Sequence, residues 1–588
     1  MRSMSIYAAP TYQPTAFLQR LPEDEIIYFA LPDRFANGDP ANDHGGIAGG
    51  KMADGYDPTD KGYYHGGDLK GLLNHIDYIQ GLGATALWVG PIFKNKAVQG
   101  TSAGYHGYWI TDFTQVDPHF GTNADFKRLV DAAHARGMKV YMDIVVNHTA
   151  DVIQYKECLP GKPCPYRSIA DYPYTRQGGV NGAPINPGFE GDDAAHQTPA
   201  NFAHLTNPDY AYTPFVPKGE RHVKKPEWLN NPIYYHNRGD TTYRGENSTY
   251  GDFGGLDDIF TENPRVVQGF IDIYGKWIDD YHIDGFRIDT AKHVNPEFWA
   301  RFVPAMMARA KAAGITHFHI FGEVPDPEFS PAFAKTHHLP ALLDFGVFGA
   351  IRSVVAEGQS PALLNRAFWN DALWPNGAEG ARQLATFVGN HDAGRFAMFV
   401  RRANPKASKD ELEKRTLLGY AMLLSLRGVP VIYYGDEQGF IGHGDDKDAR
   451  QDMFGSKVAS YNDDMLLGTS ATTATPRFDT SHPFYKAIAE MNRIRRVTPA
   501  LRHGDQIFRT SEDDPGLIAV SRKLPGKEGE VLLVFNTSAH TIKRQVLVDS
   551  ASAHWHSLHG HCANAPSAPG SYPITLAPFD YLFCTTGN

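Results

Sequence analysis

At 588 residues the chain is too long for one simple core, so we expect a large domain with at least one smaller module. Its 56 Lys and Arg against 66 Asp and Glu give a net charge of -10 without any basic run, which argues against nucleic acid or an anionic membrane surface as a partner. No apolar run reaches about 18 residues, which argues against a membrane span.

From residue 26 onward the chain repeats one pattern, in which a short apolar strand is followed by a loop and an amphipathic helix. The eight expected strands span residues 26–31, 84–90, 139–146, 285–289, 317–324, 341–347, 384–390 and 430–436. Helices with apolar residues at three- and four-residue spacing are expected between them, for example at 68–83, 123–138, 264–281 and 409–428. Eight such alternations predict an α/β fold of the (β/α)8 TIM-barrel type, because a doubly wound open sheet seldom has so many.

The regular spacing is interrupted once, after the third strand. Residues 149–262 are rich in Pro, Gly, Asn, Tyr and Asp, and a connection of that length predicts an inserted subdomain. After a last helix at 482–497, short alternating runs separated by turn residues predict a C-terminal antiparallel β-sandwich domain. We therefore expect an N-terminal extension at 1–25, a barrel formed by 26–148 and 263–504, an inserted domain at 149–262, and a β domain at 505–588.

The four cysteines form two close pairs in the sequence, Cys158 with Cys164 and Cys562 with Cys584. The first pair brackets a turn-rich loop that a disulfide could close, and its spacing is not usual for zinc. Such pairs favour an oxidising compartment over four free thiols.

The start of the chain, MRSMSIYAAPTYQPTAF, lacks the features of a signal peptide, so the protein is either cytoplasmic or has a signal outside this chain. The cysteines favour a secreted or periplasmic protein.

Charged residues gather where the expected strands end, which is where barrels of this kind carry their chemistry. The strand ends supply Asp143, Asn147, His148, Arg287, Asp289, Glu323, Asn390, His391 and Asp392. In the fourth strand the alternation of apolar and charged residues places Arg287 and Asp289 on one face, where the guanidinium can hold the carboxylate ionised. A structural ion pair is the alternative for such a pair in isolation. Paired carboxylates at one cavity are typical of glycosidic bond cleavage.

These segments resemble the motifs of the α-amylase family, glycoside hydrolase family 13. The resemblance runs, in the family's order, through DIVVNHT (143–149), GFRIDTAKH (285–293), FGEV (321–324) and FVGNHD (387–392), with further matches at GYHGYW (104–109) and GVPVIYYGDE (428–437). It implies that Asp289 is the nucleophile, that Glu323 is the general acid/base, and that Asp392 binds and distorts the sugar at the cleavage point. The substrate-binding residues that it implies are Tyr108, His148, Arg287, Lys292, His293 and His391.

The residues themselves suggest how the two reacting carboxyl groups differ. Glu323 ends an apolar strand, where partial burial should raise its pKa and keep it protonated, whereas Asp289 beside Arg287 should stay charged. Lys292 and His293 match the Lys-His pair that the family's amylases and cyclodextrin-forming enzymes place on the leaving-group side. This match favours long-chain substrates over those of the α-glucosidase and cyclomaltodextrinase branches.

A cluster of carboxylates and amides near the N-terminus suits a hard cation such as Ca2+, with an Asx-rich turn as the alternative. Its members are Asn37, Asp39, Asn42, Asp43, Gly66 and Asp68. Resemblance to the calcium loop of cyclodextrin glycosyltransferases and related amylases favours the metal, although Asn37 stands where many relatives have an aspartate. A second Ca2+ is implied by Asn147 and Asp258 with the backbone carbonyl of His293, and it would join the inserted domain to the barrel.

We therefore expect a retaining α-1,4-glucan hydrolase, an endo-acting α-amylase that acts as a monomer on starch or maltodextrins with Ca2+ as cofactor. The first alternative is a cyclomaltodextrinase, a maltogenic amylase or an α-glucan transglycosylase. Cyclomaltodextrinases often carry an extra N-terminal β domain, whereas the first barrel strand here starts near residue 26. A remote alternative is a catalytically inactive binding relative, but such proteins lose the carboxylates that this chain keeps.

Overall fold

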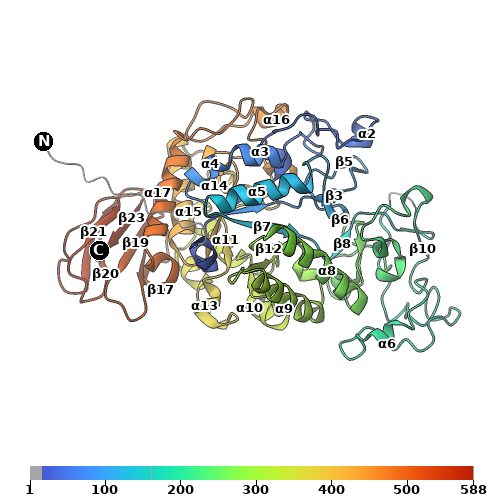
Figure 1. The fold of residues 1–588 in the computed structure, drawn as a ribbon. Helices are drawn as coiled ribbons and strands as arrows, with labels where there is room; N and C mark the ends of the chain where they lie inside the picture. Colours follow the sequence, from blue (N-terminus) through green and yellow to red (C-terminus); the bar gives the residue numbers. More distant parts are fainter. Residues whose placement is uncertain (1–15, 160–161, 587–588) are drawn as a thin grey trace.

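The computed structural model describes residues 16–159 and 162–586, so most of the expected N-terminal extension lies outside the described residues. At the centre of the molecule, eight parallel strands are hydrogen-bonded in the order β14, β13, β12, β7, β2, β1, β16 and β15 (Figure 1). These strands are β1 Ile27–Ala30, β2 Ala86–Val89, β7 Lys139–Ile144, β12 Gly285–Ile288, β13 His319–Gly322, β14 Ala341–Leu342, β15 Ala385–Thr386 and β16 Val429–Tyr433. A parallel bridge between Leu343 and Ala385 joins the two outer strands, so the sheet closes into the predicted (β/α)8 barrel.

The barrel strands are recognisable in the sequence because they are buried on both faces. Every residue of β1, β2, β7, β12, β13 and β16 is buried. One face of each strand meets the filled interior of the barrel and the other meets the surrounding helices, which explains the nearly continuous apolar runs. Asp143 on β7 and Arg287 on β12 are charged exceptions, and their two strands pair with these residues side by side.

Helices surround the barrel and connect its strands (Figure 1). They are α1 Pro32–Phe35, α2 Lys51–Asp54, α3 Leu69–Asn74, α4 Ile76–Gly81, α5 Asn123–Ala135, α8 Pro264–Tyr281, α9 Pro296–Ala312, α10 Ser330–Thr336, α11 Phe345–Ile351, α12 Ala362–Ala367, α13 Gly377–Ala381, α14 Phe396–Ala403, α15 Lys409–Ser425, α16 Ala459–Asn462, α17 Pro483–Val497 and α18 Ala500–His503. Helix α5 starts with a capping box between Thr122 and Asp125. None of the helices within the described residues has the length and hydropathy needed to cross a membrane.

The segment at 68–83, expected as one helix, is two helices. Helix α3 ends at Asn74, the backbone angles of the next residue, His75, are φ -111° and ψ 14° and are not helical, and α4 begins at Ile76. The His75 ring nitrogen Nδ1 lies 2.9 Å from the carbonyl oxygen of Gly71, one turn earlier in α3. The apolar spacing continues across this break, which is why the sequence pattern did not reveal it.

The inserted segment 149–262 contains little regular structure and lies on one side of the barrel (Figure 1). Its helices and strands are β9 Gln154–Tyr155, α6 Pro199–Phe202, β10 Pro214–Phe215, α7 Asn247–Tyr250 and β11 Asp257–Asp258, with short 3-10 helices at Lys218–Glu220, Glu227–Asn230 and Pro232–Tyr234. Strand β11 pairs with β8 His148–Thr149 at the end of the barrel. It has a hydrophobic cluster of its own, which includes Tyr174, Phe189, Phe202, Tyr210 and Phe260. Four short strands precede it near the same end of the barrel: β3 Phe93–Asn95, β4 Val98–Gln99, β5 Ser102–Ala103 and β6 Ile110–Val116.

The C-terminal part forms two antiparallel sheets on the opposite side of the barrel (Figure 1). The larger sheet contains β17 Asp505–Ser511, β18 Leu517–Lys523, β19 Val531–Asn536, β21 His556–His559 and β23 Tyr581–Thr585, and the smaller one contains β20 Ile542–Leu547 and β22 Ser571–Leu576. Val534 of the first sheet, Val546 and Ile574 of the second, and Trp555 between them belong to one buried cluster, as expected of a sandwich. The other face of the larger sheet joins the main core of the barrel.

Candidate active site

Arg287 of β12 connects three carboxylates at the C-terminal end of the barrel. Its side chain is fully buried, and Nη1 donates to Asp143 Oδ1 at 2.9 Å and to Asp289 Oδ1 at 2.8 Å. Its Nη2 forms an ion pair with Glu323 Oε2 at 2.9 Å. Because β7, β12 and β13 are neighbours in the sheet, three residues from separate parts of the chain reach the same guanidinium. The arrangement predicted from the strand ends is therefore present.

Asp392 lies on the other side of this group and has partners of its own. Arg450 Nη2 donates to Asp392 Oδ1 at 2.8 Å, and His391 Nε2 lies 3.2 Å from Asp392 Oδ2. The hydroxyl of Tyr108 joins the two halves of the site, because it donates to Asp143 Oδ2 at 3.0 Å and lies 2.9 Å from His391 Nε2. Hydrogen bonds and ion pairs thus connect Asp392 and Arg450 with the carboxylates that Arg287 contacts.

A cavity of about 460 Å³ opens above these groups. Its lining contains the carboxylates of Asp289, Glu323 and Asp392 together with the apolar side chains of Phe253 and Leu256 from the inserted segment. Carboxylates beside aromatic and aliphatic surfaces suit a sugar ring, which has hydroxyl groups on its edge and C–H groups on its faces. The cavity can therefore bind a carbohydrate and bring it into contact with all three carboxylates.

Of the other residues predicted to bind substrate, Tyr108 and His148 line the cavity, whereas Arg287 and His391 lie beneath it and contact the lining residues. Lys292 and His293 lie beside the cavity and are not part of its lining. Lys292 Nζ is 3.8 Å from Asp326, and the ring of His293 is 2.6 Å from the carbonyl oxygen of Ser248.

Burial raises the pKa of both Asp289 and Glu323 to about 7, although Arg287 acts in the opposite direction on each. The expected contrast between an ionised Asp289 and a protonated Glu323 is therefore not found. The physical reason is that Arg287 is shared among three carboxylates, while the nearby negative charge of Asp392 raises the pKa of both groups. Two coupled groups with similar pKa values share one proton near neutral pH.

Among the remaining titratable groups of the site, Asp143 also titrates close to neutrality, because burial raises its pKa to about 6 although Arg287 acts in the opposite direction. Burial raises the pKa of Asp392, but His391, Arg450 and Arg287 outweigh it, so this pKa lies below its usual value. Burial lowers the pKa of both His148 and His391 to about 3, so both imidazoles are neutral. Asp289 and Glu323, together with the neighbouring Asp143, are therefore the carboxyl groups of this site expected to change their charge near neutrality.

Two of the residues that complete the site were not singled out by the sequence analysis. Arg450 orients Asp392, and Phe253 lines the cavity and stacks on His148 with 5.6 Å between the ring centroids. Both come from irregular segments, one after β16 and one inside the insertion. No periodicity or spacing in such segments indicates which side chains point into the cavity, so only the fold could identify them.

The N-terminal cluster has features of a cation site. Asn37 Nδ2 donates to Asp43 Oδ1 at 2.8 Å, while the buried Oδ1 atoms of Asn37 and Asn42 have no hydrogen-bond partner among the described residues. Gly66 lies against the same group, and a Cβ atom there would be 2.6 Å from Asp43 Oδ1. Unpartnered buried amide oxygens beside a carboxylate fit a hard cation such as Ca2+.

Two other members of that predicted set have different partners. Asp68 caps helix α3 by accepting from the N–H group of Gly71 at 2.6 Å, and it also accepts from the N–H groups of Gly38 and Asp39 and from Asn42 Nδ2 at 3.2 Å. The carboxylate of Asp39 is half-exposed and lies 3.5 Å from Lys70 Nζ. The residues that fit a cation here are thus Asn37, Asn42 and Asp43.

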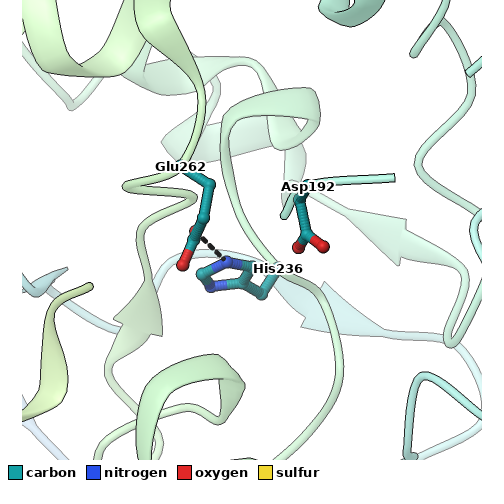
Figure 2. Close-up of side chains that lie close together, drawn as sticks. All are labelled: Asp192, His236 and Glu262. Atoms are coloured by element: carbon teal, nitrogen blue, oxygen red, sulfur yellow. Dashed lines mark hydrogen bonds and ion pairs between the residues drawn. The ribbon is translucent and has the colours of Figure 1, made fainter. Parts of the chain in front are cut away.

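The second implied calcium set includes a carboxylate that already has a partner. The pairing of β8 with β11 brings Asp258 close to Asn147. Asp258 Oδ2 lies 2.6 Å from Nδ1 of His236. The other ring nitrogen of His236 lies 2.9 Å from Glu262 Oε2 (Figure 2). Neither His236 nor Glu262 was singled out in the sequence.

Comparison with known proteins relates the chain to carbohydrate-active enzymes. Residues 29–504 match the family described as "Alpha amylase, catalytic domain". An α-amylase of Streptomyces lividans is 44% identical over 539 residues, which cover 90% of this chain but only 57% of that protein. A solved α-amylase of Anoxybacillus has a TM-score of 0.69 at 27% identity and covers 96% of this chain and 98% of its own. The solved cyclomaltodextrin glucanotransferase CldA, with a three-domain ABC distribution, has a TM-score of 0.70 at 26% identity, and the match covers 96% of this chain and 99% of CldA.

Proposed function

This chain belongs to the α-amylase family of glycoside hydrolases, and we propose that it is a retaining, endo-acting α-1,4-glucan hydrolase that acts on starch and maltodextrins. The observation that carries this proposal is the contact of Asp289 and Glu323 with one buried guanidinium at the floor of a cavity that fits a sugar. Paired carboxylates in such a cavity are the groups that a double displacement at an anomeric carbon requires.

In the proposed mechanism Asp289 attacks the anomeric carbon and forms a glycosyl-enzyme. Glu323 gives its proton to the departing glycosidic oxygen in the same step. The glutamate then takes a proton from water, and the resulting attack on the same carbon releases Asp289 and restores the α configuration. The charged carboxylate of Asp392, oriented by Arg450, binds hydroxyl groups of the sugar at the cleavage point.

The proposal is tested by following products from soluble starch and from β-cyclodextrin side by side. Rapid loss of iodine staining with mixed short maltooligosaccharides, and little attack on the cyclodextrin, is the expected result. Preference for β-cyclodextrin would identify a cyclomaltodextrinase instead. Products longer than a maltooligosaccharide donor would identify a transglycosylase, the alternative that similarity to CldA and to the cyclomaltodextrin glucanotransferase of Niallia circulans favours.

The shared proton predicts a bell-shaped dependence of kcat/KM on pH. The active form has Glu323 protonated and Asp289 ionised, and burial raises the pKa of each to about 7. Activity should fall at low pH because Asp289 gains a proton and at high pH because Glu323 loses one, with the maximum near neutrality. The measurement is the initial rate on a soluble maltooligosaccharide at low concentration from about pH 4 to pH 10. A rate that stays constant over this whole range would contradict the assignment.

We propose that Asn37, Asn42 and Asp43 hold a Ca2+ ion whose role is structural. Chelation should then lower the melting temperature by about 2 °C, because loss of a ligand bound at about 100 times its Kd costs about 2.7 kcal/mol and a chain of 588 residues has an unfolding entropy of about 1.2 kcal/mol/K. Replacing Asp43 with Ala should remove most of this shift. The matched control is Asp39→Ala, because that carboxylate is half-exposed beside Lys70 and should leave the shift unchanged. Equal shifts in the two variants, measured by calorimetry, would contradict this site.

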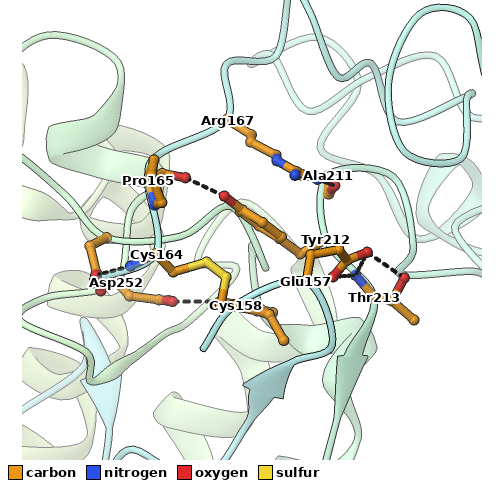
Figure 3. Close-up of a disulfide and its surroundings, with 11 residues drawn as sticks. Glu157, Cys158, Cys164, Pro165, Arg167, Ala211, Tyr212, Thr213 and Asp252 are labelled. Atoms are coloured by element: carbon orange, nitrogen blue, oxygen red, sulfur yellow. Dashed lines mark hydrogen bonds between the residues drawn. A yellow bond between two sulfur atoms is a disulfide. The ribbon is translucent and has the colours of Figure 1, made fainter. Parts of the chain in front are cut away.

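We also propose that the protein acts as a monomer in an oxidising compartment, secreted or periplasmic. The disulfide between Cys158 and Cys164 lies in the inserted segment beside Tyr212, whose hydroxyl donates to the carbonyl oxygen of Pro165 at 2.6 Å (Figure 3). A second disulfide joins Cys562 to Cys584 on β23. Disulfides of this kind persist mainly in oxidising environments, which supports the proposed compartment.

A further inference from the structure

A second cluster of ionisable side chains lies in the inserted segment, apart from the residues of the proposed catalytic mechanism. Asp192, His236 and Glu262 each direct one possible ligand atom to a common point, and these atoms all lie within 4.8 Å of one another (Figure 2). All three residues are buried, with exposed fractions of 8%, 0% and 1%. They are widely separated in the sequence, so only the fold brings them together.

The hydrogen bonds of this cluster orient its atoms as in a metal site. In the tautomer of His236 whose Nδ1 donates to Asp258 Oδ2, at 2.6 Å, Nε2 carries a free lone pair. That Nε2 atom lies 2.9 Å from Glu262 Oε2, and the Tyr174 hydroxyl donates to Asp192 Oδ2 at 2.6 Å. A carboxylate behind a histidine that faces further carboxylates is the usual outer support of a metal-bound imidazole.

The cluster holds three carboxylates, and His236 is the side chain that forms ion pairs with two of them. In the part of the chain that the structure describes, no Lys or Arg forms an ion pair with Asp192, Asp258 or Glu262. In addition, Glu262 Oε1 is buried and has no hydrogen-bond partner among these residues. Buried carboxylates without compensation are costly, and a cation between them removes that cost. The free oxygen of Glu262 is thus a second observation, independent of the cluster itself, that indicates a ligand.

We propose that Asp192, His236 and Glu262 form a binding site for one divalent first-row metal ion, with Zn2+ as the preferred ion. A set of one imidazole nitrogen and two carboxylate oxygens suits Zn2+, whereas Ca2+ takes six to eight oxygen ligands. Ligands at about 2.1 Å around a tetrahedral Zn2+ ion lie about 3.4 Å apart, so the present atoms need to move by only about 1 Å. This site is separate from both predicted calcium sites, although Asp258 links it to the second one through His236.

The position of the site indicates a structural role. Asp192 and His236 belong to the inserted segment, and Glu262 is its last residue, directly before the cap of helix α8 at Asn263. An ion at this point would join the end of the insertion to the first turn of a barrel helix. The loop that contains Phe253 and Leu256, which line the catalytic cavity, lies between two of the ligands in the sequence. The ion should therefore stabilise the insertion without taking part in catalysis.

Zinc binding is tested on the full chain after metal removal, in buffer with about 1 mM Ca2+ to keep oxygen-ligand sites filled. Equilibrium dialysis with metal analysis should show that the wild-type chain binds one Zn2+ ion. The variants Glu262→Gln and Asp192→Asn should each bind this ion at least about 100-fold more weakly. The matched control is Glu227→Gln, the same chemical change in the inserted segment at an exposed carboxylate that pairs with Lys225 instead. This control should bind Zn2+ as the wild type does.

X-ray absorption at the zinc edge of the zinc-loaded wild type should also show an imidazole among four light-atom ligands. This measurement needs no variant, so the test stays valid if a variant fails to fold. Circular dichroism confirms the fold of each variant. The proposal is overturned if all four proteins bind the same amount of Zn2+, or if the absorption spectrum shows no imidazole. It is also overturned if Ca2+ at about 1 mM prevents zinc uptake, because the site would then prefer oxygen-seeking ions.

Discussion

Replacing Asp289 with Asn should lower kcat/KM on soluble starch by about 10⁴-fold or more while the protein stays folded. The amide keeps the size of the side chain and can still accept from Arg287, but it cannot form the glycosyl-enzyme. Arg287 keeps its contacts with Asp143 and Glu323, so no buried charge is left without a partner. The measurement is the initial rate on starch, with circular dichroism and thermal melting as checks of the fold.

The matched control for this variant is Asp446→Asn. Asp446 also lines the cavity and pairs with Arg450, but its side chain is 58% exposed, so it should contribute little to the reaction. We expect the control to lose less than about tenfold in kcat/KM, since removal of an exposed ion pair costs about 1 kcal/mol or less. If Asp289→Asn hydrolysed starch at a rate within about tenfold of the rate of Asp446→Asn, the assignment of the nucleophile would be contradicted.

Replacing Glu323 with Gln should separate the two steps of the reaction. Hydrolysis of starch should fall by about 10³-fold, because the departing sugar oxygen needs a proton that an amide does not give. With α-maltosyl fluoride the first step should remain fast, because fluoride leaves without protonation. A burst of fluoride release followed by slow turnover is the expected result, because water is no longer activated in the second step. Equal losses on starch and on the fluoride, with no burst, would show that Glu323 is not the general acid/base.

The barrel could be predicted from the sequence because both faces of its strands are buried, so each strand is a nearly continuous apolar run. The meeting of side chains from the ends of β7, β12 and β13 could be predicted as well, because neighbouring parallel strands end at the same edge of the sheet. The break at His75 could not, because apolar spacing continues through it. Local pattern thus predicts elements well but does not reveal where an element is interrupted.

The chemistry of the site needed the fold for a different reason. The sequence placed Arg287 beside Asp289 but gave no sign that the same guanidinium contacts Asp143 and Glu323, so the two reacting carboxyl groups were expected to differ in pKa. Arg450 and His236 come from irregular segments, where no repeat relates sequence position to direction in space. Shared charges and contacts between distant loops are properties of the assembled structure.

The most direct test of the central claim is to locate the covalent intermediate. In the Glu323→Gln variant mixed with α-maltosyl fluoride, the glycosyl-enzyme should accumulate because its hydrolysis is slow. Mass spectrometry of the rapidly quenched protein should then show the addition of one maltosyl group, and peptide mapping should place it on Asp289. A maltosyl group on Asp143 or Asp392, or turnover of the fluoride without any covalent adduct, would contradict the mechanism.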